Sequence, residues 1–143
     1  MSASGMVNGI ITNLSAASVL GASGASTDYF VLETTSACCA VVSLQQADHI
    51  PLTFGNPMSG GTTYVMLVEG YVRDQNDPVK TMRDNIGFVD VIFNTIKSDD
   101  TLQGSISTVN RISARKNPNE VLSVGGLLWI PTYFEIEGFE FGE

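Results

Sequence analysis

The sequence is short of charge, and of basic charge above all. Only 15% of its 143 residues are charged, and seven Lys and Arg stand against fifteen Asp and Glu, which gives a net charge of −8. A soluble domain usually carries about a quarter charged residues. Sequence-specific DNA binding needs Lys and Arg at the phosphates, so this function is disfavoured. The acidity fits plain solubility, and it equally fits a surface past which DNA slides without sticking.

Histidine and cysteine are almost absent, which argues against metal sites and most catalytic constellations. His49 is the one histidine, and the sequence names no nucleophile for it to activate. Cys38 and Cys39 are adjacent, so a strand would point them to opposite faces, and no second Cys or His gives zinc spacing. We expect buried thiols in a reducing compartment, with no metal and no cofactor.

Catalytic signatures are missing as well. GxGxxG after a strand, GxxxxGK[ST], GxSxG and HExxH do not occur. The neighbouring acids Asp99 and Asp100 are typical of a turn, and Glu135 and Glu137 share one strand face that we expect to meet solvent. The sequence therefore predicts a protein that is not an enzyme.

Targeting and membrane segments are also lacking. Residues 1–27 carry no charge, but they have neither the basic start nor the long apolar run of a signal peptide. Asn8, Thr12 and Asn13 interrupt them, so we expect no membrane span. The length predicts one domain over 1–143 with a real core. Ser, Thr, Asn and 14 Gly replace the missing charge, which is typical either of a contact surface or of neutral loops.

The best-organised segment is 77–104, which predicts a long helix over 78–97. Asp77 is a good N-cap and Pro78 suits the first helical position. Apolar residues recur at spacings of three and four, which predicts a buried stripe of Val79, Met82, Ile86, Val89, Phe93 and Ile96, widened by Ile92. Asn85 falls inside this stripe, where its amide needs partners. Phe88 and Val91 fall outside it, which indicates either a second interface or ordinary exposed hydrophobic residues.

The remaining pattern predicts one more helix and several strands. Met6, Ile10, Leu14 and Ala17 form one apolar face of a first helix that ends near Gly21. Strands are predicted at 37–44, within 49–56, at 62–74, at 101–115 and at 127–141. The order α-β-β-β-α-β-β predicts an α+β fold, with a mixed, mostly antiparallel sheet and two helices packed on one face.

Three stretches of the chain are "TTYVMLVEGYVRD", "NDPVKTMRDNIGFVDVIFNTIKSDDTLQGSI" and "LLWIPTYFEIEGFE". Together they resemble the tail-terminator proteins of long-tailed bacteriophages, and the likeness covers roughly residues 30–140. It consists of a strand ending near Glu-Gly, a polar loop, a helix running into "DDTLQG", a variable strand and a final strand of the type "F-E-I-E". Residues 1–27 depart from it, because such an N-terminal helix usually carries charged residues.

The resemblance implies a structural virion protein, assembled in the host cytoplasm, that forms a homo-oligomeric ring, usually a hexamer. The ring would cap the tail tube, contact the tube protein and a neck or head-completion protein, and let genomic DNA pass without specific binding. It implies contact surfaces at the sheet edges and in the loops 55–61 and 115–120, to which the helix side adds its own candidates. The candidate contact residues are Asn56, Pro57, Met58, Phe88, Val91, Lys116 and Asn117. The alternatives are another head–tail joining or tail-tube protein, a small α+β ligand-binding domain with an apolar pocket between helix and sheet, and an enzyme.

Overall fold

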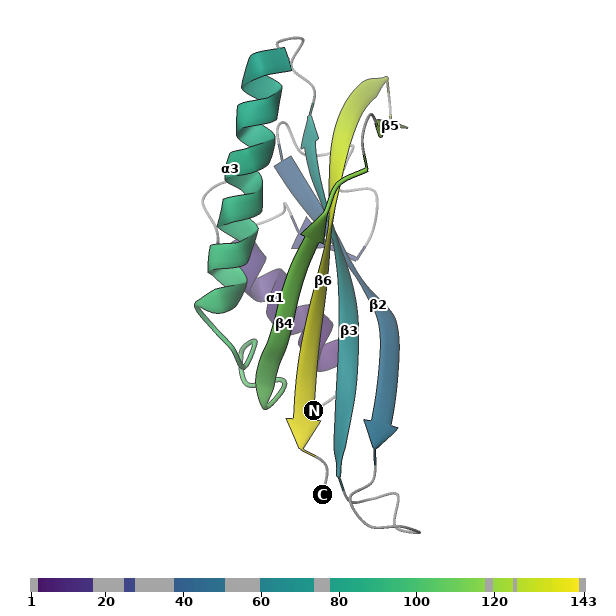
Figure 1. Cartoon of the computed structure of the whole chain (residues 1–143), viewed down its shortest axis with the longest axis vertical. Helices are drawn as coiled ribbons and strands as arrows, with labels where there is room; N and C mark the ends of the chain where they lie inside the picture. Colours follow the sequence, from purple (N-terminus) through teal and green to yellow (C-terminus); the bar gives the residue numbers. More distant parts are fainter. Residues whose placement is uncertain are drawn as a thin grey trace.

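A computed structural model describes residues 3–16, 25–27, 38–50, 60–73, 78–117, 120–124 and 126–141 of the chain. In these ranges the chain forms two helices and six strands (Figure 1). They are α1 (Ala3–Ser15), β1 (Ala25–Ser26), β2 (Cys38–Ile50), β3 (Gly61–Arg73), α3 (Pro78–Lys97), β4 (Thr108–Arg115), β5 (Leu122–Val124) and β6 (Leu127–Phe141). The expected α+β class is confirmed.

The strands form one sheet in the order β1-β2-β3-β6-β4, with β5 also paired to β6. Only β1 and β2 run parallel, and every other pair is antiparallel. β4 pairs with residues 133–139 of β6, and β5 pairs with residues 127–129. The two strands therefore follow one another along the same side of β6, whose other side pairs with β3. The centre of the sheet is therefore built from the long strands β2, β3 and β6.

Both helices cover the same face of the sheet, as the sequence predicts. Met6, Ile10 and Leu14 of α1 share one buried core cluster with Phe88, Ile92 and Ile96 of α3 and with residues from β2, β3 and β6. The sheet residues of this cluster are Ala40, Val42, Met66, Val68, Val72, Phe134 and Ile136. A smaller cluster of Cys39, Val41, Tyr71 and Trp129 lies on other positions of the same strands, so it belongs to the opposite face.

Two strands differ from their predicted bounds. The segments 37–44 and 49–56 were expected as separate strands, but residues 38–50 form the single strand β2, and residues 51–56 lie outside the described part. The segment 101–115 was expected as one strand, but β4 begins only at Thr108. Residues before it form turns, in which Leu102, Gln103 and Gly104 have positive φ angles of 49°, 63° and 74°. A strand cannot continue through such angles.

The first helix is shorter than its apolar pattern predicts. Its described part ends at Ser15 with a turn at Ala16, whereas Gly21 was expected to end it. Ala17, Gly21 and the N-cap candidate Asp77 lie outside the described residues. The predicted face is correct, because Met6, Ile10 and Leu14 are buried. Neither described helix combines the length and apolarity that a membrane crossing requires.

Candidate functional site

α3 has the predicted bounds, but it presents a different side to the sheet. Val79, Met82 and Ile86 were expected in the core and are 62%, 62% and 60% exposed. Phe88, expected on the surface, is 1% exposed. The buried side of the helix is Thr81, Asn85, Phe88, Ile92 and Ile96, at spacings of four, three, four and four. Phe88 is therefore a core residue, and its assignment as a contact between copies is corrected.

The polar residues on the buried side of α3 explain why this side, and not the predicted one, faces the sheet. Asn85 donates a hydrogen bond from Nδ2 to the Thr132 hydroxyl at 3.0 Å, and Lys116 Nζ donates to Asn85 Oδ1 at 3.5 Å. A buried amide is tolerated when its hydrogen bonds are made. The partners that Asn85 needs are thus present, and they hold the N-terminal half of α3 against β6.

Val79, Met82 and Ile86 form what we call the apolar stripe of α3. Successive residues of a helix are offset by about 100°, which places this stripe roughly a third of a turn from the buried side. Farther along the same side of the helix, Val89 and Phe93 are half-buried and pack against the core. Three large apolar side chains that are each more than half exposed on one helix side are typical of an interaction surface.

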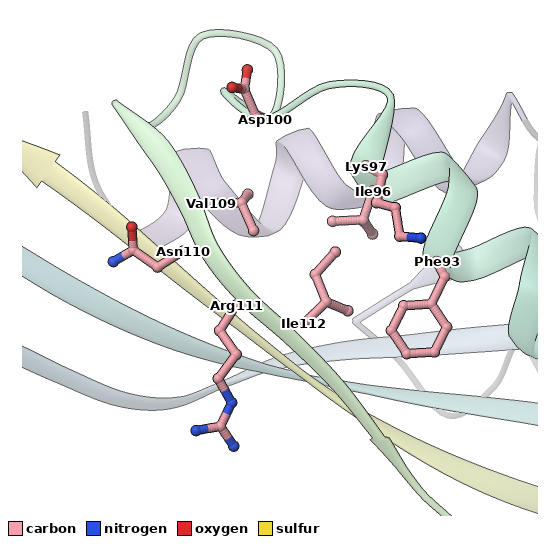
Figure 2. A pocket seen from close by; sticks show the side chains of 8 residues that line it. All are labelled: Phe93, Ile96, Lys97, Asp100, Val109, Asn110, Arg111 and Ile112. Carbon is pink, nitrogen blue, oxygen red and sulfur yellow. The ribbon is translucent and has the colours of Figure 1, made fainter.

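β4 is a free edge of the sheet. Among the described strands it pairs only with β6, and its other side carries no strand. A groove of about 330 Å³ runs between this edge and the C-terminal half of α3. Its lining is Phe93, Ile96, Lys97, Asp100, Val109, Asn110, Arg111 and Ile112. Figure 2 shows Phe93 and Ile112 facing this hollow, whereas Arg111 points to the other side of β4.

The second half of β2 is exposed. Among the described strands, β1 pairs with Ala40 and Val41 of β2, and all residues from 43 to 50 are exposed. The pairing of β2 with β3 shifts register between Leu44 and Gln46, which marks a bulge. β4 carries a similar irregularity between Val109 and Arg111. Bulges and charges on edge strands can guard against uncontrolled pairing, so free edges alone do not define a function.

The face of the sheet away from the helices carries charge next to β4. Tyr133 and Glu135 of β6 line a shallow hollow there with Arg111, Ser113 and Arg115 of β4. The Arg115 guanidinium lies 5.9 Å from the centre of the Tyr133 ring, within the range of a cation–π contact. Gln45 donates to the Glu135 carboxylate at 3.4 Å, so β2 also reaches this face. Glu135 was expected to meet solvent, but it is half-buried rather than exposed.

The turn after α3 ties the two helices together. Asp99 accepts hydrogen bonds from the Gln103 backbone N–H at 2.8 Å and from Asn13 of α1 at 3.1 Å. Asn13 in turn accepts one from the Gln103 side chain at 2.6 Å. The Gln103 bond and then the Asn13 bond hold the pKa of Asp99 below its ordinary value. This is the predicted turn role of Asp99, made by the "DDTLQG" segment.

The other predicted contact residues lie in different places. Val91 is half-buried, Lys116 and Asn117 are exposed, and Asn56, Pro57 and Met58 lie outside the described residues. Asn117 donates to Glu120 at 2.6 Å, and the Tyr133 hydroxyl donates to the same carboxylate. The Tyr133 bond, followed by the Asn117 bond, lowers the pKa of Glu120. Lys116 and Asn117 are thus anchored at the end of β4.

The histidine and the two cysteines all lie on β2. His49 is exposed, and its Nδ1 lies 2.8 Å from the Thr62 hydroxyl. Burial, reinforced by the nearby Asp84 carboxylate, raises the pKa of the Cys38 thiol to about 11. Within the residues that the structure describes, no three His, Cys, Asp or Glu side chains come together in a way that would hold a metal.

The sequence pattern predicted contacts in the loops 55–61 and 115–120, but it did not predict the apolar stripe of α3. Its three members were assigned to the core, because apolar spacing alone does not tell a buried helix side from an exposed one. No known family model matches the chain, and no curated protein matches it.

Proposed function

We propose that this chain is a ring-forming tail terminator of a long-tailed bacteriophage, a structural virion protein without catalytic activity. The observation that carries the proposal is a pair of surfaces: the β4 edge, which pairs with β6 alone among the described strands, and the apolar stripe of α3. A closed ring needs two different patches that fit each other, and an additional surface for the neighbours above and below. The resemblance in the segments 62–104 and 127–140 supplies the particular assembly.

In this proposal each surface has one task. The sheet edges meet neighbouring copies within the ring, and the apolar stripe of α3 meets the tail tube protein or a neck protein. Genomic DNA passes through the ring, and the net charge of −8 keeps it from adhering. The protein would be assembled in the host cytoplasm and reside at the neck of the virion.

The nearest rival is another head–tail joining or tail-tube protein. It would use the same kinds of surface, but a tube protein stacks into long polymers of itself, whereas a terminator stops at one ring. A ligand-binding domain is less well supported. The space between α3 and the sheet is filled by Phe88, Ile92 and Phe134, and the described groove lies at the sheet edge.

The test is made on particles. Deleting the protein should leave filled heads and separate tails, many of them longer than normal, and supplying it again should restore joining. Heads without DNA, or the loss of tails with no tube polymer, would make the chain a head or tube component. Unaffected particles would reject the proposal and move the ligand-binding alternative ahead.

A further inference from the structure

The apolar stripe of α3 is bordered by two charged residues that have no partner on their own helix. The three members of the stripe are between 60% and 62% exposed, and Arg83 and Asp90 beside them are exposed as well. Neither charge has an opposite charge three or four positions away, the spacings at which ion pairs form along a helix. Their side chains make no ion pair or hydrogen bond in the described part of the chain, where the ion pair of this helix joins Lys80 to Asp84.

The stripe lies on the side of α3 that is turned toward the β4 edge. Phe93 and Lys97 continue this side of the helix, and they line the groove against β4 (Figure 2). β4 is the last strand of the described sheet in this direction, and it runs beside α3 (Figure 1). No described strand therefore stands between this side of the helix and a second molecule.

Two copies of α3 fit each other when they lie side by side in opposite directions. If the 20 residues 78–97 overlap fully, residue 78 lies opposite residue 97 of the second copy. This register places Met82 opposite Phe93 and Ile86 opposite Val89 of the second copy. Apolar residues that recur at alternating spacings of three and four form the seam between paired helices. Full overlap therefore brings apolar residues together along the helix.

The same register brings the unpaired charges together. Arg83 and Asp90 both lie on the flank of the stripe that is turned away from the sheet, and a two-fold axis brings this flank of each helix against the same flank of the other. Arg83 is then level with residue 92 of the second copy, two residues from Asp90, which is about 3 Å along the helix axis. The symmetry makes the contact twice, so each arginine meets an aspartate.

We infer that two copies of the free protein associate through α3, antiparallel about a two-fold axis, with their apolar stripes packed together and Arg83 of each copy paired with Asp90 of the other. A second copy is the occupant that the charges specify, because both members of each ion pair are supplied by this one helix. The inference goes beyond the proposed function and does not depend on it. In a tail terminator, the dimer would cover the stripe until the tube or neck protein displaces the second copy.

The association should be reversible. One helix from each copy buries less area than a standard interface of about 1,600 Å², so we expect a dissociation constant in the micromolar range. Analytical ultracentrifugation of the full chain over a series of concentrations should show a monomer that converts into a dimer as the concentration rises. A chain that stays monomeric up to millimolar concentration would overturn the inference.

The first variant places a charge in the seam. Ile86→Asp should remain a monomer at concentrations at which the wild-type chain is a dimer. Val121→Asp is the matched control, because Val121 is a 51% exposed apolar residue outside α3, and this variant should form the dimer like the wild-type chain. Thermal melting should show both variants folded. A dimer that persists in Ile86→Asp, or that is lost equally in Val121→Asp, would overturn the inference.

The second set of variants tests the register. Arg83→Asp places two acids together, and Asp90→Arg places two arginines together, so each should weaken the dimer by about fivefold or more. Combining both reversals in one chain should restore the dimer, because the ion pairs re-form with their signs exchanged.

Asp90→Arg is the sharper of the two reversals, because it makes the net charge less negative. If general repulsion between acidic copies governed association, this variant would bind itself more tightly than the wild-type chain does. Tighter association of Asp90→Arg, or no recovery in the combined variant, would reject the pairing of Arg83 with Asp90.

Failure of this contact and failure of the proposed function are distinguishable. If the deletion gives unterminated tails while the pure protein is monomeric at every concentration, the terminator role stands and the α3 contact is wrong. If the dimer forms and responds to the variants as expected while particles lacking the protein are unaffected, the α3 contact is real and the terminator role is wrong.

Discussion

Two apolar residues of α3, Phe88 and Ile86, lie two positions apart in the sequence and have opposite surroundings. Phe88 is buried beside Ile92 and Phe134, while Ile86 is 60% exposed. Phe88→Ala should lower the free energy of unfolding by about 3–5 kcal/mol, because it removes a ring and leaves a cavity. Ile86→Ala should change it by less than about 1 kcal/mol, as exposed substitutions do. The assignment of Ile86 to the core would have predicted a large loss.

Denaturant unfolding of the two variants decides between these assignments. They lie two residues apart on one helix, so each serves as the control for helix propensity in the other. A loss for Ile86→Ala equal to that for Phe88→Ala would show that the helix is rotated relative to the structure described above. A further variant at the same position, Ile86→Asp, tests function. It should leave the fold intact and impair the joining of heads to tails if the apolar stripe meets a neighbour.

Gly70 of β3 is required because α3 approaches the sheet closely there. A Cβ atom at this position would lie 2.6 Å from the Phe88 ring and 3.1 Å from the Phe134 ring. Gly70→Ala should therefore destabilise the protein by about 1–3 kcal/mol through overpacking. Thermal or denaturant melting measures the change.

Gly87 is the matched control for Gly70. It lies in the middle of α3, and an added Cβ would meet nothing within 4 Å. Gly87→Ala should stabilise the protein by up to about 1 kcal/mol, since alanine favours the helix and restricts the unfolded chain. The opposite signs expected for the two alanines make the comparison decisive, and two losses of equal size would contradict the close approach at Gly70.

At the scale of elements, the sequence determines the long, strongly periodic segments best. Helix 78–97 and strand 127–141 have the bounds that their patterns predict. The side that α3 presents was missed, because two stripes are possible on this helix. Thr81 and Asn85 occupy the buried one, and hydrogen bonds such as that from Asn85 to Thr132 compensate their polarity. Partners 47 residues away in the chain are invisible to a periodicity argument.

The sequence predicted the kinds of candidate surface, namely sheet edges and loops, but it predicted their positions less well. The edge position of β4 among the described strands follows from strand order, which the sequence alone does not supply. The segments 37–44 and 49–56 were predicted as two separate strands, although the single strand β2 runs from 38 to 50. The turn before β4 was missed because Leu102 and Gln103 adopt positive φ angles that non-glycine residues seldom take.

The link between the turn after α3 and helix α1 predicts an acid-sensitive contribution to stability. The pKa of Asp99 is lowered in the folded protein, so its ionised form is the one that folding favours. Its contribution is fully present above the unfolded pKa of about 3.8 and is lost as the pH falls through the folded value. Asp99→Asn should lower the free energy of unfolding by about 1 kcal/mol at neutral pH through weakened hydrogen bonds.

Unfolding measured across pH tests this role. The difference between the wild-type chain and Asp99→Asn should shrink as the pH falls below about 4. Asp100→Asn, the neighbouring acid on the exposed side of the turn, serves as the control and should change the free energy of unfolding little at neutral pH. A constant difference for Asp99→Asn over the whole range would mean that the charge of Asp99 does not matter.

At the scale of the whole molecule, charge governs how the protein meets DNA. The net charge is −8, and three of the seven basic residues, Arg111, Arg115 and Lys116, lie together at the β4 edge. An isolated chain can therefore neutralise few phosphates. We expect no binding of duplex DNA tighter than micromolar at moderate salt. Any weak binding at low salt should fall with salt at a slope of no more than about 2.7, which is 0.9 for each of three contacts.

A gel-shift titration at several salt concentrations measures both quantities, with Arg111→Gln/Arg115→Gln/Lys116→Gln as the matched variant. The residual binding of the wild-type chain should disappear in this variant, because the described basic cluster is removed. A sub-micromolar affinity for duplex DNA with a steep salt dependence would contradict the proposal that DNA passes through the ring without adhering. It would point to a protein that holds DNA directly.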